Sequence, residues 1–256
     1  MATPRRVEFI GIGGLPEIVA GDPITEMVVR RAAAQGTPLA ENDILVVTQK
    51  VVSKSEGRMF ALSSVTPSPQ AADLAGRTRR DPRLVELILR ESAAIVRVDE
   101  TRGIIITETR HGFVCANSGI DSSNVPGEET VCLLPVDPDA SARAIREDVC
   151  RLSGLESVAV VITDTFGRAW REGHVNFAIG VAGMDPFNDY RGAADALGKS
   201  LKVTRIAVAD EVAAASELVM AKSDGVPAAI ARGVPFRHAD GSARGLLRDR
   251  THDLFR

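Results

Sequence analysis

The segment that decides the fold reads V-A-V-V-I-T-D-T-F-G-R-A-W-R-E-G-H-V-N-F-A-I-G, from Val158 to Gly180. It opens with a continuous apolar run, which is typical of a buried strand. The run ends in Thr163 to Thr165, and the side chains of Arg168 and Arg171 follow. Hard cations bind oxygen ligands and arginine forks match phosphate oxygens, so this order indicates a metal and phosphate site. The alternative is that Asp164 only caps the next turn.

The composition is that of a globular protein. The chain has 256 residues, enough for one large domain or two small ones that share an interface. It is 45% hydrophobic and 25% charged with a mean hydropathy of +0.03, an ordinary balance for a soluble fold. No run of about 18 apolar residues occurs, so no membrane-spanning helix is expected. The N-terminal residues lack the apolar core of a signal peptide.

Cysteine content and charge exclude further classes. Cys115, Cys132 and Cys150 are far apart and form no C-x-x-C, so neither a disulfide framework nor a zinc knuckle is indicated. A reducing cytoplasm is therefore the expected location. The net charge is −3 and aromatic residues make up only 4%, which argues against a nucleic-acid-binding surface.

Periodicity and capping signals predict helices and strands in mixed order. Helices are predicted from Asp22-Pro23, from Asp81-Pro82, over Pro138–Leu152 and over Glu211–Met220. Strands are predicted over Val7–Ile10, Asp43–Val47, Ala94–Val98, Gly103–Thr107, Phe113–Cys115, Val158–Ile162 and Arg205–Val208, with a loop over 61–69. The order has no regular βαβ rhythm and no repeat, which favours a mixed α/β (α+β) fold over a doubly wound sheet. A boundary between two closely packed subdomains would fall near Asp137 or Gly154.

The glycine-rich segment near the N-terminus does not match the known nucleotide motifs. Gly11-x-Gly13-Gly14 lacks the spacing of G-x-G-x-x-G, because Pro16 stands where the third glycine belongs. The chain also has no G-x-x-x-x-G-K-[ST] sequence. The fold is therefore expected to be neither Rossmann nor P-loop. The alternative for this segment is a tight loop between a strand and a helix.

Two other segments follow predicted strands with groups suited to phosphate and metal. In Gln49–Arg58, Lys50 and Lys54 are four residues apart, so one helical turn would place both on the same face, as a phosphate cradle needs. The alternative is a solvated charged turn. In Asn117–Asn124, Asp121 is the natural metal ligand and Asn124 a contact to a base or sugar. Here the alternative is an ordinary Asx-rich turn.

The combination of these segments is more specific than any one of them. The histidines are dispersed, with no pair at metal-ligand spacing. Two oxygen-rich strand ends, at Asp121 and at Asp164-Thr165, occur together with the cationic segments of Lys50 and Lys54 and of Arg168 and Arg171. This pattern indicates a hard divalent cation that holds a nucleotide polyphosphate.

The same residues resemble the coenzyme F420-0:L-glutamate ligase family, which includes free-standing archaeal enzymes and the N-terminal domain of a two-domain mycobacterial enzyme. The matching stretches are G-I-G-G-L-P-E-I (11–18), Q-K-V-V-S-K-S-E-G-R (49–58), A-N-S-G-I-D-S-S-N-V (116–125), T-D-T-F-G-R-A-W-R-E-G (163–173), N-F-A-I-G (176–180) and A-D-E-V-A-A-A-S-E-L-V-M-A-K-S-D-G-V-P (209–227). They follow the family's order across nearly the whole chain.

The resemblance implies a reaction and a set of site residues. GTP would phosphorylate the terminal carboxyl of F420-0, and the amine of L-glutamate would displace the phosphate, with release of GDP and phosphate. Asp121 and Asp164 would ligate a divalent metal, Mg²⁺ or Mn²⁺, with Thr165 at a second metal. GTP would contact Leu15, Pro16, Glu17, Ile18, Gln49, Lys50, Lys54, Asn124, Met220, Ala221, Lys222, Ser223, Asp224, Gly225 and Val226. The resemblance also implies help from a potassium ion and a homodimer. Arg168 and Arg171 are added here as contacts to the anionic substrate or phosphate.

Two departures from the family pattern bear on these expectations. Many archaeal members carry Gln where this chain has Lys222, and a protonated lysine cannot ligate a metal, so a fixed positive charge would replace a ligand of the second metal. The given sequence ends at Asp253–Arg256, where the two-domain relative continues into a nitroreductase-like domain, so we expect either a single-domain ligase or the ligase domain of a longer protein. The alternative functions are a related ligase acting on another carboxylate and a deazaflavin-binding subunit without turnover.

Overall fold

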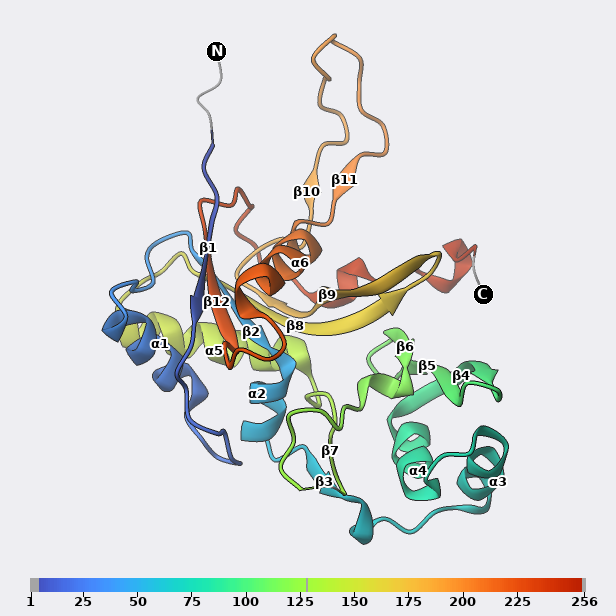
Figure 1. Ribbon diagram of the computed structural model, residues 1–256. Helices are drawn as coiled ribbons and strands as arrows, with labels where there is room; N and C mark the ends of the chain where they lie inside the picture. The colour runs from blue at the N-terminus through green and yellow to red at the C-terminus, as the bar shows by residue number, and fades with distance from the viewer. Residues whose placement is uncertain (1–4, 128, 255–256) are drawn as a thin grey trace.

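The centre of the structure is a mixed five-stranded sheet (Figure 1). The computed structural model describes residues 5–127 and 129–254. Across the sheet the strands are β1 (Glu8–Ile12), β12 (Ala228–Arg232), β2 (Ile44–Thr48), β8 (Ala159–Arg168) and β9 (Arg171–Ala182). Strands β2 and β8 pair in parallel and every other neighbour pair is antiparallel.

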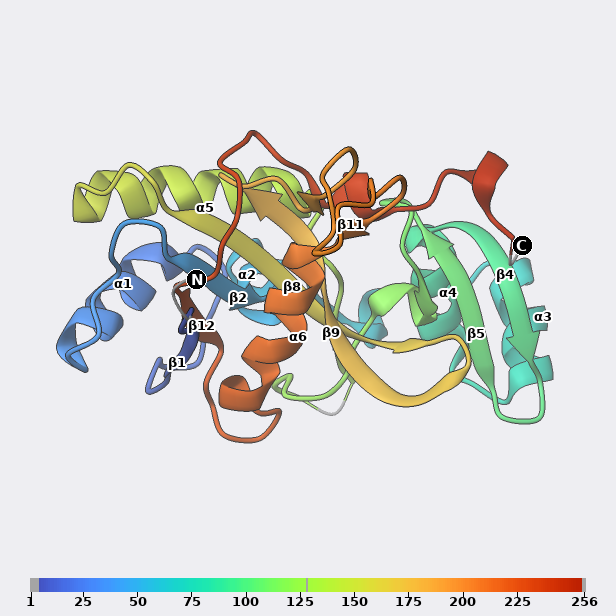
Figure 2. The same cartoon turned by 90° about the horizontal axis from the view of Figure 1, so that it is seen from above.

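Helices cover both faces of this sheet (Figures 1 and 2). Helices α1 (Ile24–Ala34) and α5 (Pro138–Ser153) lie on one face and α6 (Val208–Met220) on the other. Successive side chains of a strand point to opposite faces. Val160 therefore packs in the α1 and α5 core and Val161 in the α6 core. This double burial explains why the start of β8 is apolar at every position.

Strand β8 is longer than its parallel neighbour. The β2–β8 pairing ends at Thr48 opposite Thr163, whereas β8 continues to Arg168 beside β9 alone among the described residues. A register irregularity in the β8–β9 ladder falls between Ile162 and Thr163. Such bulges re-aim side chains. From Asp164 onward, β8 has one edge that pairs with no described strand. Side chains at this free edge can therefore line a cavity.

A smaller sheet lies beside the central one. It consists of β4 (Ser92–Asp99), β5 (Ile104–Thr109) and β6 (Val114–Ala116). Helices α3 (Pro69–Thr78) and α4 (Pro82–Glu91) pack on it around a separate apolar cluster. The remaining elements are α2 (Gln49–Ser55), β3 (Met59–Ala61), β7 (Thr130–Cys132), β10 (Asn188–Asp189), β11 (Arg205–Ile206) and the short 3-10 turns at 62–64, 117–119, 243–246 and 250–252.

The structure confirms the predicted α+β class and several element boundaries. The side chains of Asp81 and Asp137 cap α4 and α5, as the Asp-Pro signals predict. Asp22 does not cap α1, although Asp22-Pro23 carries the same signal. Its side chain instead accepts a hydrogen bond from the Val19 N–H at 2.8 Å, and α1 begins one residue later than predicted, at Ile24. No helix of the described residues is long and apolar enough to cross a membrane.

The strand predicted over Arg205–Val208 is wrong in its second half. Strand β11 ends at Ile206 and α6 begins at Val208. The reason is that Val208 is the first buried residue of the helix and packs in the α6 core, so its apolar side chain serves a helix rather than a strand. Strands β9 and β12 and helix α3 were not predicted from the sequence. That the chain forms one domain stays a prediction.

Candidate active site

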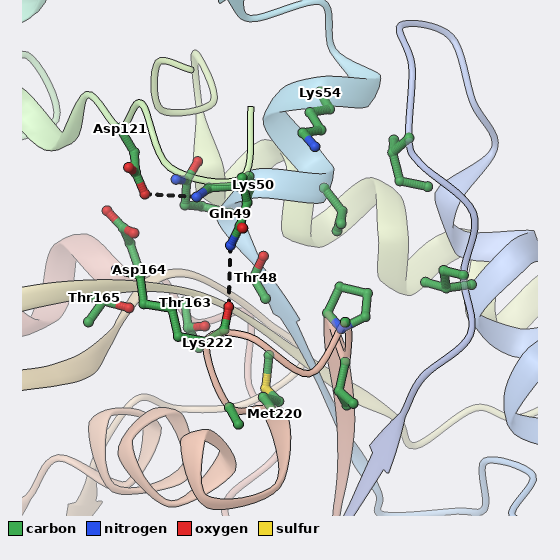
Figure 3. Close-up of a pocket in the computed structure, with 18 of the residues that line it drawn as sticks. Thr48, Gln49, Lys50, Lys54, Asp121, Thr163, Asp164, Thr165, Met220 and Lys222 are labelled. Carbon is green, nitrogen blue, oxygen red and sulfur yellow. Dashed lines mark hydrogen bonds and ion pairs between the residues drawn. The ribbon is translucent and has the colours of Figure 1, made fainter. Parts of the chain in front are cut away.

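A cavity of about 650 Å³ opens where β2 ends beside the middle of β8 (Figure 3). Four segments that are far apart in the sequence meet there: the loop after β1, the first turns of α2, the loop after Asp121 and the end of α6 with the loop that follows. The polar end of β8 forms its floor. Its position follows from the fold, because β2 ends at Thr48 while β8 continues past it.

Helix α2 supplies two ammonium groups on one face. Lys50 and Lys54 both line the cavity, with side chains only 15% and 7% exposed. Gln49 is buried and its amide oxygen accepts a hydrogen bond from Ser53 at 2.9 Å, which holds the first turn of the helix. The Lys54 ammonium is paired with Glu17 of the loop after β1. The segment is therefore a partly buried helix and not the solvated turn that the sequence left open.

Asp121 forms an ion pair with Lys50 in the lining of the cavity. The Lys50 ammonium donates to Asp121 Oδ2 at 2.8 Å and to the Ser123 carbonyl at 2.6 Å. The Ser123 N–H donates to Asp121 Oδ1 at 2.7 Å, so an Asx turn is present as well. Burial alone would raise the pKa of Asp121, but these hydrogen bonds and the lysine charge outweigh it and hold the pKa below its usual value.

Asp164 has no such ion-pair partner among the described residues. It lies within β8, so it does not cap a turn. Burial raises its pKa to about 7, and the charge of Asp121 adds to this effect, while the Thr165 N–H and the charges of Lys50 and Lys222 oppose it. Figure 3 shows the two carboxyl groups on the same side of the cavity, with Lys50 beside them. The structure thus brings together the two aspartates that the sequence placed at separate strand ends.

Most of the other predicted residues also line this cavity. They are Leu15, Pro16, Glu17, Ile18, Asn124, Thr165, Met220, Ala221, Lys222, Ser223, Gly225 and Val226. Asn124 donates to the Lys222 carbonyl at 3.2 Å, which ties the loop after Asp121 to the loop after α6. Asp224 is exposed next to these residues but does not line the cavity.

The two arginines predicted as substrate contacts lie outside the cavity lining. Arg168 ends β8, and one terminal nitrogen of its guanidinium, Nη1, is buried without a hydrogen-bond partner among the described residues. Arg171 is exposed at the start of β9. Their roles stay predictions.

The sequence analysis overlooked several lining residues, above all Thr48, Thr163, Asn176 and Glu217. Thr48 ends β2 beside Thr163 of β8, and both threonines directly follow an apolar run in the sequence. Asn176 and Glu217 could be found only with the β8–β9 register and the packing of α6. Thr163 is 1% exposed, and its hydroxyl has no partner among the described residues, so a polar group of a ligand would satisfy it.

The donor set fits a hard divalent cation bound together with phosphates. Among the described residues no three His, Cys, Asp or Glu side chains form a cluster that could hold a metal by themselves. The cavity instead offers the carboxylates of Asp121 and Asp164 and the hydroxyl of Thr165. Mg²⁺ is usually held by one or two carboxylates plus substrate phosphates and water. A cation here would also offset the burial of the Asp164 charge.

Comparison with known proteins gives a single consistent result. The sequence profile described as F420-0:Gamma-glutamyl ligase matches residues 13–233. The chain is 48% identical over 253 residues to the coenzyme F420:L-glutamate ligase of Methanothermobacter thermautotrophicus, covering 98% of this chain and 99% of the relative. Proteins of the same name match at 43% identity in Methanopyrus kandleri, over 96% of this chain and 100% of the relative, and at 40% in Methanocaldococcus jannaschii, over 98% of each.

Proposed function

Because the chain belongs to the F420-0:gamma-glutamyl ligase family, we propose that it joins L-glutamate to coenzyme F420-0 at the expense of GTP. The enzyme class is that of a ligase, in keeping with the names of the relatives. The observation that carries the proposal is the cavity beside the middle of β8 that is lined by two aspartates and two partly buried lysines. A site of this kind suits the activation of a carboxylate by a nucleotide.

The proposed reaction has two steps. An oxygen of the F420-0 carboxylate attacks the γ-phosphorus of GTP, the bond to the β-phosphate oxygen breaks, and GDP leaves. The amine of L-glutamate then attacks the acyl carbon, the carbon–oxygen bond to phosphate breaks, and the amine loses a proton. The first step brings together two anions, so positive charge around the phosphates lowers its barrier.

The residues of the cavity suit this task. Lys50 and Lys54 lie about one helical turn apart, a spacing that lets both ammonium groups reach neighbouring phosphates. Asp121 and Asp164, with Thr165, would hold Mg²⁺ or Mn²⁺. Such an ion, when bound, would neutralise phosphate charge and orient the γ-phosphate. Lys222 would add a fixed charge on the same side, since its charge already acts on Asp164. The potassium ion, a second metal and the homodimer stay predictions.

The decisive experiment follows GDP release and product mass together. The full chain is incubated with GTP, Mg²⁺, F420-0 and L-glutamate, and each substrate is omitted in turn. We expect one F420-0-derived product with an added glutamate residue for each GDP released, and no steady release without F420-0. GTP hydrolysis at an equal rate when F420-0 or glutamate is absent would contradict the coupled reaction. A product from another carboxylate, but not from F420-0, would favour the related-ligase alternative.

A further inference from the structure

Asn176 and Glu217 line the cavity and form a hydrogen-bonded chain to Thr165. The Thr165 hydroxyl lies 2.7 Å from Asn176 Oδ1, and Asn176 Nδ2 lies 3.0 Å from Glu217 Oε2. Asn176 is 3% exposed, so its amide is withdrawn from bulk water. The reaction described above assigns no role to either residue.

The chemistry of the three groups fixes the direction of this chain. An ionised carboxylate only accepts hydrogen bonds, so the amide nitrogen of Asn176 must face Glu217. The amide oxygen then faces Thr165, and the hydroxyl of Thr165 must donate its proton to it. The lone pairs of the hydroxyl oxygen then remain available on the cavity side. A neutral oxygen binds a cation through such lone pairs.

The fold holds the chain in place from two elements. Thr165 and Asn176 are direct partners in the β8–β9 ladder, and opposite residues of an antiparallel pair share one face of the sheet. Helix α6 packs on that face and presents Glu217 in its last turns. Glu217 forms no ion pair with the described lysines and arginines, so its carboxylate serves the asparagine amide.

We propose that Asn176, oriented by Glu217, is a positioning residue that turns the lone pairs of the Thr165 hydroxyl toward the metal–phosphate site. The inference rests on the proposed function, because it assumes that a divalent cation binds near Thr165. Partners that orient the ligands of a metal typically change its affinity by about 10- to 100-fold when they are lost. The effect should therefore appear in metal binding itself, before any turnover.

The first test measures the binding of Mn²⁺ alone to the full chain by electron paramagnetic resonance. We expect Asn176→Leu and Thr165→Val each to weaken binding by about 10-fold or more. The double variant should bind no more weakly than Thr165→Val, because Asn176 acts only through that hydroxyl. Losses that multiply in the double variant, or normal Mn²⁺ affinity in Asn176→Leu, would overturn the positioning role.

The second test changes only Glu217 and leaves Thr165 and Asn176 unchanged. It asks whether Glu217 orients the Asn176 amide or contacts the cation itself. Glu217→Gln keeps an oxygen that can accept from Asn176, so it should retain Mn²⁺ affinity and turnover within about threefold. Glu217→Leu removes that acceptor, lets the amide turn its nitrogen toward Thr165, and should weaken Mn²⁺ binding as Asn176→Leu does. If Glu217→Gln is as damaged as Glu217→Leu, the carboxylate acts directly and the inference is wrong.

Thermal unfolding of each variant shows whether the fold is kept. If Asn176→Leu does not fold, the two Glu217 variants decide the question. The wild-type chain separates this inference from the proposed function. Mn²⁺ binding that is lost in Asp164→Asn but unchanged in Asn176→Leu and Glu217→Leu would overturn the inference alone. Absence of Mn²⁺ binding to the wild-type chain, both without nucleotide and with GDP added, would overturn the metal site and the inference together.

Discussion

Asp121 and Asp164 line the same cavity, but their carboxyl groups lie in opposite electrostatic surroundings. Asp121 accepts hydrogen bonds from the Lys50 ammonium and the Ser123 N–H, and its pKa is lowered. Asp164 is partly buried without a basic partner at hydrogen-bond distance among the described residues, and its pKa is raised to about 7. The first carboxylate is therefore ready as an anion, whereas the second carries an energetic cost when it ionises.

The difference suggests how one site can be stable when empty and still bind a cation tightly. Lys50 compensates the charge of Asp121 inside the folded chain. Among the described residues the charge of Asp164 has no comparable partner, so under the proposed function a divalent cation would supply the missing positive charge. Pairs of titratable groups whose pKa values are driven apart are a common mark of functional sites.

The largest expected effect is on turnover. Asp121→Ala and Asp164→Ala should each lower the rate of glutamate addition by about 100-fold or more, since each removes a group that holds charge in the transition state. Asp73→Ala is the matched control, because this aspartate is 72% exposed on α3, outside the cavity. Steady-state rates with F420-0, GTP and Mg²⁺ give the comparison. Near-normal turnover in both cavity variants would refute the metal assignment.

The second prediction concerns the stability of the metal-free chain. The folded-state pKa of Asp164 is raised from 3.8 to about 7, so the folded state binds a proton more tightly than the unfolded state. Ionisation therefore destabilises the fold progressively between about pH 4 and pH 7, and fully above that range. By linkage the cost reaches about 4 kcal/mol.

Asp164→Asn removes this cost. In urea unfolding with a chelator at pH 8, the variant should be more stable than wild type, and the gain should vanish near pH 4. Added Mg²⁺ should reverse the order, because it stabilises only the chain that binds it. A variant that is less stable than wild type at pH 8 without metal would show that the Asp164 charge is compensated in the folded chain.

The third prediction is that the corresponding change at Asp121 lowers the stability of the fold. Asp121→Asn leaves the ammonium of Lys50 without its charged partner, so the free energy of unfolding at pH 7 should fall by about 1 to 2 kcal/mol. The pKa of Asp121 is lowered by folding, so its contribution is present above the ordinary pKa of 3.8 and is lost as the pH falls below it. At pH 8, unfolding curves should place Asp164→Asn above and Asp121→Asn below wild type in stability, and the gap between the two variants should narrow at pH 4. If the two substitutions change the free energy of unfolding by the same amount and in the same direction, the two aspartates do not lie in opposite electrostatic surroundings.

Part of this contrast could be predicted from the sequence. The apolar run before Thr163 identifies β8, because only a strand buried on both faces needs five apolar residues in succession. The aspartates at two strand ends and the lysines four apart on α2 indicate a phosphate and metal site. The contact between Lys50 and Asp121 was not predictable, since it joins residues 71 positions apart through a β-bridge between Asp121 and Cys132.

The rest depends on tertiary structure. Asn176 joins the cavity only because the β8–β9 ladder places it opposite Thr165, and a one-residue change of register would send it to the other face. Glu217 stands in a run of helix-forming residues and looks like a solvated side chain of α6. Strand β12, A-A-I-A-R, was missed because alanine has low strand propensity, and its burial between β1 and β2 overrides that preference.

The smallest expected effect tests whether Thr163, like Asp164, lacks a compensating hydrogen-bond partner in the ligand-free chain. Thr163 precedes Asp164, and its buried hydroxyl also has no partner among the described residues. Thr163→Val keeps the shape and removes the unsatisfied group, so the ligand-free chain should gain about 1 kcal/mol. Thr107→Val is the control, since the Thr107 hydroxyl is buried and lies 2.8 Å from the Ser118 hydroxyl, and its loss should destabilise the fold by a similar amount.

Both variants are compared by thermal unfolding with and without GTP and Mg²⁺. If the Thr163 hydroxyl serves the ligand, the shift in melting temperature caused by GTP and Mg²⁺ should be smaller in Thr163→Val than in wild type, and unchanged in Thr107→Val. A loss of stability in ligand-free Thr163→Val would mean that its hydroxyl is already satisfied, for instance by bound water. In that case, of these two residues only the carboxyl group of Asp164 would lack a partner. The contrast with Asp121 would then concern the charge of the carboxylate and not hydrogen bonding in general.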